Sequence, residues 1–319
     1  MLTVCATHGH CFDGLCSAVL FRELQKKLFP SSDLKIIACG YGTKQTEPNQ
    51  EMLSGDQNAV LDFRYVNVPR LTFYFDHHKT AFLSPEDHGD FERRAAEDPS
   101  FFVFAPEETS CTKLLNRVLT ESHGLDLSRY ADLVQWADVV DSARFASAAA
   151  ATDTAEPVLQ LVSVVEQFGD DAFLTQLVSR IESEGLDDVA KSALVREKFR
   201  GIAPQQQAYT ARVKEKGQMM GSTVLVDLTE KRVTSMTKFA AYAAFPSATY
   251  SVLVALQSSG IKISVGHNPW SGKPREHDIS AICRRYGGGG HPVVGGIALG
   301  KGEVERARAI ARTIAEELG

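Results

Sequence analysis

Cysteine is scarce in this sequence, and its spacing excludes two common kinds of site. Six of the 319 residues are cysteine, and no two of them form a Cys-x-x-Cys pair. We therefore expect neither a zinc knuckle nor a thioredoxin-type motif. Most of the six lie in apolar surroundings, which is typical of reduced, buried thiols.

Long apolar runs and an excess of basic charge are also missing. No stretch approaches the ~20 apolar residues of a membrane-spanning helix, and no basic segment precedes the first apolar run. We expect no membrane span and no signal peptide, and hence a cytoplasmic protein. Asp and Glu number 40 against 34 Lys and Arg, and the net charge of −6 argues against a broad surface that coats nucleic acid. A small basic pocket for a short phosphorylated substrate is compatible with this charge.

The sequence does contain an α/β pattern that is long enough for two domains. Its hydrophobic content of 44% and charged content of 23% are those of ordinary globular proteins. In the first half, apolar runs alternate with helical segments, which indicates a largely parallel sheet with crossover helices. The predicted strands are 2–7, 35–39, 59–63, 71–75 and 101–104, and the predicted helices are 17–28, 111–119, 128–141 and two within 157–185.

A polar, amphipathic segment then precedes a second α/β pattern. We interpret this segment as a helical connector, so the predicted organisation is a catalytic domain at 1–188, a helical linker at 189–216 and a smaller α/β domain at 217–319. Residues 146–155, which are rich in Ala, Thr and Ser, are predicted to form a surface loop. The predicted strands of the second domain are 222–227, 250–256, 261–265 and 295–299, and its predicted helices are 235–245, 278–286 and 303–318.

The stretch Asp76-His77-His78 directly follows a predicted buried strand. In open α/β sheets, ligands bind at the carboxyl edge of the strands. Other polar side chains are predicted to reach the same edge. They are His8 and Asp13 after the first strand, Asp62 at the end of the third, and Asp138 and Asp141, which lie three apart on one helical face.

Carboxylates and imidazoles without thiolate pairs suit Mn²⁺ or Mg²⁺, with Fe²⁺, Co²⁺ and Zn²⁺ as alternatives. Two such ions about 3.5–4 Å apart stabilise both the attacking and the leaving oxygen of a phosphoryl displacement. Each motif alone has a simpler explanation: a strand-end aspartate is usually a cap, Asp13-Gly14 is ordinary turn chemistry, and acidic helix faces are usually solvated. The joint pattern is what predicts a two-metal site.

These motifs resemble those of the DHH phosphoesterases, in order and over nearly the whole chain. Asp76-His77-His78 matches the motif that names the family, Asp62 matches its preceding strand-end aspartate, and Asp141-Ser-Ala-Arg-Phe145 is similar to its fourth motif. The resemblance implies that His8, Asp13, Asp62, His77 and Asp141 are metal ligands, with Asp62 bridging. It also implies that His78 contacts phosphate or donates a proton, so we assign catalytic roles to His78 and Asp76.

The first motif departs from the family pattern at Cys11, which stands where many members have an aspartate. Three interpretations stay open. Cys11 is a thiolate ligand and favours a softer metal; His10 supplies the missing ligand; or the first metal site is weak and fills only with substrate. Asp138 is the alternative to Asp141 if the register of that helix differs.

The second domain carries a glycine-rich stretch, Gly287 to Gly290, followed by His291. Backbone N–H groups in such a run can approach an anion closely, although a hinge or tight chain reversal is equally typical of glycine. The stretch also resembles the DHHA1-type domain that accompanies DHH domains, which implies that Gly288, Gly289, Gly290 and His291 bind substrate. The arginine expected before this loop is absent, because Gly266 takes its place, and Trp270 is a candidate surface for stacking a base.

The sequence thus predicts a phosphoric ester hydrolase of α/β fold that uses metal-bound hydroxide, with two Mn²⁺ as the first choice of cofactor. Its expected substrates are short single-stranded oligoribonucleotides or small phosphonucleotides, as for a phosphodiesterase, an exonuclease or a nucleotide phosphatase. Alternatives are a cyclic-dinucleotide or polyphosphate hydrolase, and a non-catalytic nucleotide-binding protein with a degraded first metal site. The chain is also compatible with a homo-oligomer.

Overall fold

The computed structural model describes residues 1–40, 48–234 and 236–319, which form two compact units. The first unit comprises Met1–Arg144 and Ala155–Phe199, and the second comprises Phe145–Thr154 and Arg200–Gly319. The long helix α9 (Ala193–Lys216) begins in the first unit and ends in the second. The catalytic, linker and substrate-binding assignments of residues 1–188, 189–216 and 217–319 remain predictions.

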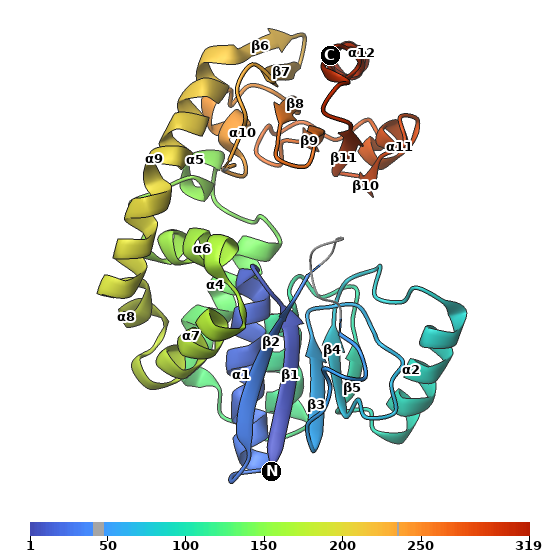
Figure 1. The fold of residues 1–319 in the computed structure, drawn as a ribbon, viewed down its shortest axis with the longest axis vertical. Helices are drawn as coiled ribbons and strands as arrows, with labels where there is room; N and C mark the ends of the chain where they lie inside the picture. Colours follow the sequence, from blue (N-terminus) through green and yellow to red (C-terminus); the bar gives the residue numbers. More distant parts are fainter. Residues whose placement is uncertain (41–47, 235) are drawn as a thin grey trace. The chain divides into compact units, whose positions relative to one another are not determined.

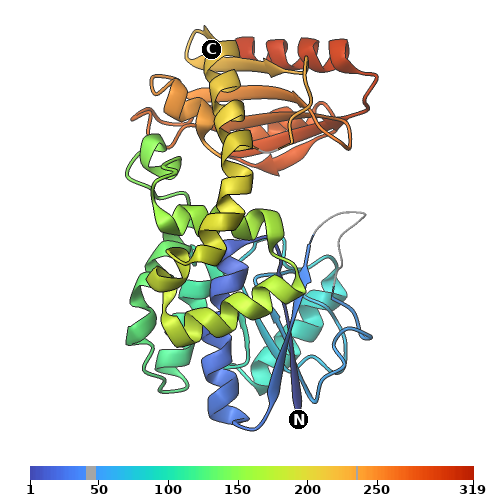
Figure 2. The ribbon, with the colours of Figure 1, turned by 60° about the vertical axis from the view of Figure 1, so that its left-hand side comes forward.

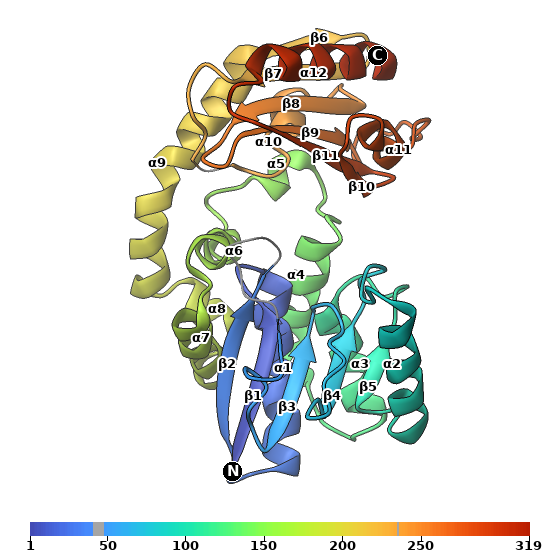
Figure 3. The ribbon, with the colours of Figure 1, turned by 45° about the vertical axis from the view of Figure 1, so that its right-hand side comes forward.

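The first unit is built on a five-stranded sheet that is parallel throughout, as the sequence predicts. The strand order is β2-β1-β3-β4-β5, and Figure 3 shows the five strands side by side with a common direction. All four residues of β4 are buried, which fits a strand covered on both faces. The bounds are β1 Leu2–His8, β2 Asp33–Cys39, β3 Gln57–Leu61, β4 Phe73–Asp76 and β5 Phe102–Phe104.

Helices cover both faces of this sheet. On one face, Phe21 of α1 packs edge-on against Phe73 of β4. On the other face, Phe91 of α2 packs against Tyr74, and it is the only buried residue of that otherwise polar helix, all of which the structure describes. The remaining helices of the first unit lie around α1 and α3 (Figure 1). The bounds are α1 Phe12–Leu28, α2 Pro85–Glu97, α3 Cys111–Glu121, η1 Ser128–Tyr130, α4 Ala131–Asp141, α6 Pro157–Phe168, α7 Asp171–Glu184 and α8 Leu186–Ala190.

The strand order places a topological switch point between β1 and β3. The chain passes from β1 to β2 on one side and then adds β3 on the other side of β1. Ligands of open α/β sheets bind at the carboxyl ends of the strands that flank such a point. β1 ends at His8, and Asp62 directly follows β3, so both residues lie at this position.

The second unit contains a mixed six-stranded sheet in the order β10-β11-β9-β8-β7-β6. β7 and β8 are parallel, whereas the other neighbours are antiparallel. Helices α11 and α12 pack on one face, and Figure 2 shows α12, in red, running along the sheet. The other face packs against α10 and the end of α9. The bounds are α5 Ala148–Ala151, β6 Gly217–Met220, β7 Thr223–Leu228, α10 Ala240–Ala244, β8 Tyr250–Leu256, β9 Ile261–His267, α11 Ile279–Arg284, β10 Gly289–His291, β11 Val294–Leu299 and α12 Val304–Leu318.

Several elements differ from their predicted extents. α1 begins five residues earlier than predicted, because Gly14 lets the first helical turn approach β1: a Cβ at Gly14 would lie 2.2 Å from the His8 carbonyl oxygen. The helix α2 and the strands β6 and β10 were not predicted, and the predicted loop 146–155 contains α5. Of the helix predicted at 235–245, only α10 forms, and Ser235 lies outside the described residues. Among the described residues, no helix is long and apolar enough to span a bilayer.

Candidate metal centre

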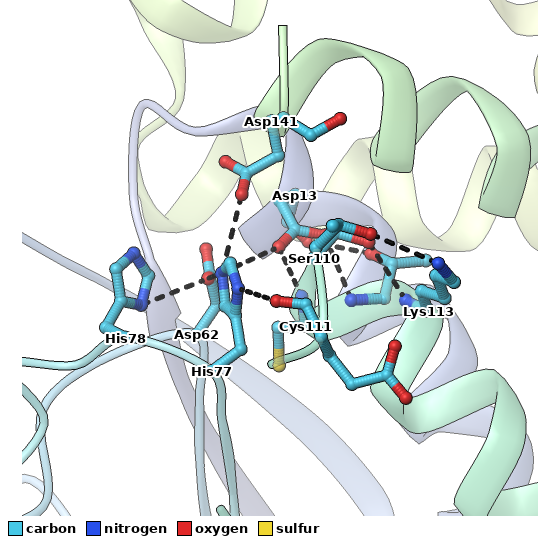
Figure 4. Close-up of polar contacts among 12 residues, drawn as sticks. Asp13, Asp62, His77, His78, Ser110, Cys111, Lys113 and Asp141 are labelled. Atoms are coloured by element: carbon cyan, nitrogen blue, oxygen red, sulfur yellow. Dashed lines mark hydrogen bonds and ion pairs between the residues drawn. The ribbon is translucent and has the colours of Figure 1, made fainter. Parts of the chain in front are cut away.

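Five of the predicted ligands meet at the carboxyl edge of the first sheet. His8 ends β1, Asp62 follows β3, His77 follows β4, Asp13 lies in the first turn of α1, and Asp141 is the last residue of α4. Figure 4 shows Asp13, Asp62 and Asp141 around the ring of His77. Three groups of side chains hold donor atoms within 4.8 Å of one another. They are His8 with Cys11 and Asp62, Asp62 with His77 and His78, and Asp13 with His77 and Asp141.

The separations between these donor atoms are those of shared ligands rather than of hydrogen bonds. His77 Nε2 lies 3.4 Å from Asp141, 3.6 Å from Asp62 and 3.8 Å from Asp13. An N–H···O hydrogen bond is typically about 2.7–3.2 Å long. Two ligands on one ion lie about 3–3.5 Å apart, because each metal–ligand bond is about 2.1 Å long. The geometry therefore fits a small cation among these atoms.

Asp62 occupies the centre of the cluster. Its side chain is 1% exposed, and within the described part of the chain neither carboxylate oxygen has a hydrogen-bond partner. Oδ2 lies 3.6 Å from His8 Nδ1, whereas Oδ1 lies 3.6 Å from His77 Nε2, so the two oxygens face different groups of ligands. The Asp62 backbone has a φ of +52°, and its N–H donates to the Phe75 carbonyl. Such a buried, unsatisfied carboxylate is costly without a cation.

Asp13 is held by the start of α3. Its Oδ2 accepts a hydrogen bond of 2.7 Å from the Cys111 backbone N–H, and its Oδ1 accepts one of 3.0 Å from the Thr112 N–H. These are the first two N–H groups of the helix, which have no partner within the helix itself. Ser110, the N-cap residue of α3, also accepts a hydrogen bond from the Lys113 N–H. Asp13 therefore joins the beginnings of α1 and α3.

His77 is oriented by a backbone carbonyl. Its Nδ1 lies 3.1 Å from the Glu108 carbonyl oxygen, which can only accept, so Nδ1 carries the proton and donates. Nε2 is left to face the three carboxylates. A histidine that donates from one nitrogen to a carbonyl while it binds a metal through the other is the usual arrangement in metal sites.

The concentration of buried carboxylates shifts the pKa values of the cluster. Burial, Asp62 and Asp141 raise the pKa of Asp13 well above its usual range. Burial lowers the pKa of His77, but Asp62, Asp13 and Asp141 outweigh this effect and raise it to about 10. Without a cation, the protein therefore retains protons in this cluster to limit repulsion between carboxylates.

The ring of His78 is oriented by Asp76 and not, like that of His77, by a backbone carbonyl. His78 Nδ1 lies 2.7 Å from Asp76 Oδ1, and Asp76 Oδ2 accepts a hydrogen bond of 3.1 Å from the Tyr74 hydroxyl. Asp76 is fully buried and, among the described residues, lies in no group of candidate ligands. Burial lowers the pKa of His78, but Asp76 and Asp62 raise it to about 9. Asp76 thus orients His78 and favours its charged form.

The three alternative ligands differ in where they lie. The Cys11 thiol joins His8 and Asp62 in one group. His10, which has a φ of +55°, instead places Nδ1 3.2 Å from the Glu166 carbonyl and belongs to no ligand group of the described residues. Asp138 is bound by Arg144 at 2.6 Å and also accepts from Thr109, so it is engaged outside the cluster.

In the second unit, two of the four glycines in the predicted binding loop are needed for chain packing. A Cβ at Gly288 would lie 2.2 Å from the Gly296 carbonyl oxygen, and Gly290 has a φ of +145°. The N–H groups of Gly287 and Gly288 donate to carbonyls of α11. A Cβ at Gly289 would meet no described atom within 4 Å. The tight chain reversal considered for this sequence is therefore present.

The structure also explains why Gly266 replaces the expected arginine. A Cβ at this position would lie 2.6 Å from the hydroxyl of Tyr242, which accepts a hydrogen bond from Ser251. Trp270 donates from Nε1 to the Phe145 carbonyl at 2.6 Å and contacts Phe239 edge-on. These contacts tie the segment 145–154 into the second unit.

Some residues of the site were not predicted from the sequence. The backbone N–H groups that hold Asp13, the Glu108 carbonyl behind His77 and the Tyr74 hydroxyl behind Asp76 are all of this kind. The predicted start of α3 after Ser110 located two of these N–H groups in the sequence. Nothing local, however, pairs them with an aspartate 98 residues away.

Comparisons with known proteins identify the fold. A scan of the sequence against models of protein families gives no match, and neither does a search of curated proteins. Among solved structures, the pGpG-specific phosphodiesterase PggH of Vibrio cholerae matches over all of both chains, with a TM-score of 0.71 and 17% identity. RecJ of Thermus thermophilus in complex with Mn²⁺ has a TM-score of 0.60 and 12% identity. The match covers all of this chain and 52% of the RecJ chain.

A third structure is described as the DHH domain of a member of a family of ribosomal proteins. Its TM-score is 0.61 at 12% identity, and the match covers 99% of this chain and 87% of that one. The parallel sheet of the first unit and the mixed sheet of the second agree with these structures. The chain therefore has the fold of the DHH phosphoesterases, as its motifs predicted.

Proposed function

We propose that this protein is a metal-dependent phosphoesterase that hydrolyses phosphodiester bonds in short oligoribonucleotides, dinucleotides included. The observation that carries this proposal is the donor cluster around Asp62 and His77. Its N···O separations of 3.4–3.8 Å are too long for hydrogen bonds and suit atoms that share a cation.

The residues present fit two divalent cations. Asp13, His77 and Asp141 would hold one ion, and His8 and Cys11 would hold the other. Asp62 would bridge them, because one of its oxygens faces each group. Divalent cations at such a site supply Lewis acidity toward water and toward a phosphate group. Mn²⁺ is our first choice for the ion at Asp13, His77 and Asp141, because these donors are oxygen and nitrogen.

His78, oriented by Asp76, would bind the phosphate or donate a proton. The Asp76 carboxylate holds Nδ1 of His78, which leaves Nε2 as the nitrogen for the substrate. The Asp76 carboxylate also favours the charged form of this ring, and a charged ring can bind a phosphate oxygen or donate a proton to a leaving oxygen. In this proposal Asp76 is a positioning residue and not, as the family resemblance led us to expect, a catalytic one.

Two observations support a short substrate: the negative net charge of the protein and its structural similarity to PggH. The net charge of −6 disfavours long polyanions. The structurally similar PggH is a pGpG-specific phosphodiesterase, and pGpG is a dinucleotide. We retain a substrate-binding role for His291, which is exposed, and for Gly289, where nothing described fills the space that a Cβ would take. The roles of Gly288 and Gly290 in binding belong to the same proposal, as does a cytoplasmic location.

The test is a hydrolysis assay with a matched pair of variants on α4. Purified protein with Mn²⁺ is incubated with labelled di- to pentaribonucleotides, a 3′,5′-bisphosphonucleotide, a cyclic dinucleotide and polyphosphate. We expect turnover of the oligonucleotides, its loss in Asp141→Asn, and its retention in Asp138→Asn, because Asp138 is bound by Arg144 outside the cluster.

Two outcomes would overturn the proposal. Tight binding of a nucleotide without turnover of any substrate would identify a binding protein instead of an enzyme. Turnover of the cyclic dinucleotide or polyphosphate alone would keep the enzyme but replace its substrate.

A second pair of variants tests whether His77 binds metal while His78 acts on the substrate. His77→Gln is expected to weaken metal binding, because Nε2 faces the carboxylates. His78→Gln is expected to leave metal binding intact and to lower kcat by roughly 10²–10⁴-fold, the usual contribution of a general acid. Equal loss of metal in both variants would contradict these roles.

A further inference from the structure

The two groups of candidate ligands that share Asp62 differ in chemistry. One holds only carboxylate and imidazole donors, in Asp13, His77 and Asp141, whereas the other includes the thiol of Cys11. We propose that the group of His8, Cys11 and Asp62 is a thiolate-containing site for a borderline cation such as Zn²⁺, Fe²⁺ or Co²⁺, and that the other group takes a harder ion. This inference rests on the proposed metal centre and specifies that its two positions are chemically different.

The backbone fixes the position of the Cys11 sulfur. Cys11 is the N-cap residue of α1, with extended dihedrals of −130° and 135°, and it follows the turn at His10. From there its thiol lies in one group with a ring nitrogen of His8 and a carboxylate oxygen of Asp62, all within 4.8 Å of one another.

Asp62 independently indicates a cation at this position. Its carboxylate is 1% exposed, and no hydrogen bond within the described residues satisfies Oδ1 or Oδ2. Oδ2 faces His8 Nδ1 at 3.6 Å, which is on the side of Cys11. The Asp62 oxygen, the His8 nitrogen and the Cys11 sulfur would together supply three ligands to one cation.

The donor set selects the class of metal. One sulfur, one imidazole nitrogen and one carboxylate oxygen give three protein ligands, which is the number in catalytic zinc sites that keep one position open. Thiolate and imidazole ligands favour Zn²⁺, Fe²⁺ and Co²⁺ over Mg²⁺ and Mn²⁺. The group of Asp13, His77 and Asp141 has no sulfur and suits Mn²⁺ or Mg²⁺. The protein would therefore bind two different metals at neighbouring positions.

Cobalt spectroscopy tests this inference directly. Metal-free protein is titrated with Co²⁺ while the thiolate-to-cobalt charge-transfer band in the near ultraviolet is recorded. We expect the band to saturate at about one ion per chain, as for one site with a single thiolate. Cys11→Ser and Cys11→Asp should abolish it, whereas Cys16→Ala, which removes a buried thiol elsewhere on α1, should retain it. Circular dichroism confirms that each variant is folded.

A competition experiment gives a second readout that needs no substitution. Wild-type protein is equilibrated with equal concentrations of Zn²⁺ and Mn²⁺, and its metal content is measured by elemental analysis. We expect at least one zinc ion per chain, because a thiolate ligand favours Zn²⁺ over Mn²⁺; carboxylate and imidazole donors also bind Zn²⁺ more tightly than Mn²⁺, so a second zinc ion agrees with the inference. Two manganese ions per chain, or a charge-transfer band that persists in Cys11→Ser, would overturn the inference.

The outcome is distinguishable from failure of the proposed function. A cobalt band that depends on Cys11, found in a protein that hydrolyses none of the phosphoesters, would support the thiolate site and refute the enzyme. Hydrolysis with Mn²⁺ by a protein that binds two Co²⁺ without the band would support the enzyme and refute the thiolate site.

Discussion

Asp13 accepts a hydrogen bond of 2.7 Å from the backbone N–H of Cys111, a residue 98 positions further along the chain. A candidate metal ligand is thereby built into the junction between two helices. The same carboxylate accepts a second hydrogen bond from Thr112, so both of its oxygens are engaged by the start of α3. The side chain that we propose as a metal ligand therefore also holds α3 in place.

This double role predicts that Asp13→Asn destabilises the protein. An amide can accept only one of the two hydrogen bonds and opposes its own NH₂ group to the other N–H. We expect a loss of about 1–3 kcal/mol in the free energy of unfolding, which is the usual cost of an unsatisfied buried group. Urea denaturation of metal-free protein measures it. An unfolding midpoint equal to that of the wild type would show that these hydrogen bonds do not hold α3.

Asp141→Asn is expected to behave in the opposite way. Asp141 raises the pKa of Asp13 through repulsion, and its side chain is 28% exposed, so its neutralisation should leave metal-free protein as stable or more stable. Saturating Mn²⁺ at about 100 times Kd should stabilise the wild type by about 2.7 kcal/mol and the variant much less. Thermal unfolding with and without Mn²⁺ measures both effects. If Mn²⁺ stabilised the two proteins equally, Asp141 would not be a ligand.

The pKa of about 10 at His77 and of about 9 at His78 makes stability depend on pH. Both values lie above the ~6.5 of an unfolded chain. Their contribution to the stability of metal-free protein is therefore complete below pH ~6.5 and is lost as the pH rises through about 9 and 10. Metal binding at Nε2 of His77 must displace its proton, so affinity should rise over the same window.

Calorimetry checks this pH dependence. Mn²⁺ is titrated into metal-free protein at pH 7 in buffers of different ionisation enthalpy, which gives the number of protons released. We expect proton release at pH 7 and tighter binding at pH 8.5. Metal affinity that is independent of pH would mean that His77 is not protonated in the metal-free cluster.

Two neighbouring glycines of the second unit, Gly289 and Gly290, are expected to differ in how much a substitution destabilises the protein. Gly290 has a φ of +145°, and its Cβ would lie 2.3 Å from the Val294 carbonyl oxygen, whereas a Cβ at Gly289 would meet no described atom within 4 Å. We expect Gly290→Ala to cost about 1–3 kcal/mol and Gly289→Ala to be nearly neutral for stability. Denaturation curves measure this, and any loss of nucleotide affinity in Gly289→Ala would then report on binding alone. Equal destabilisation would contradict the backbone geometry described for this loop.

Much of the fold could be predicted because local and tertiary signals agree. The five apolar runs predicted as strands form β1 to β5, and their alternation with helical segments correctly predicted a parallel sheet. The helices predicted at 111–119 and 278–286 start at the predicted places, because the side chains of Ser110 and Asp278 accept hydrogen bonds from the first turns of α3 and α11. The carboxyl edge of a parallel sheet then brought His8, Asp62 and His77 together.

Other features depend on contacts that the sequence does not show. The first turn of α1 is not evident in the sequence, because Asp13-Gly14 is typical of a turn and only the nearby His8 carbonyl explains the glycine. α2 was missed because one residue, Phe91, is buried along it, although Ser84 and Pro85 are typical of a helix start. The engagement of Asp138 by Arg144, and the filling of the space beside Gly266 by Tyr242, likewise required the structure.

The central claim is that Asp62 bridges two metal ions. The most direct measurement is the number of Mn²⁺ ions bound per chain, by isothermal titration of metal-free wild type and of Asp62→Asn. Two bound ions in the wild type and a loss of at least one in Asp62→Asn, with circular dichroism unchanged, is the predicted result. A wild-type protein that binds no Mn²⁺, or an Asp62→Asn variant that binds it with unchanged number and affinity, would contradict the account.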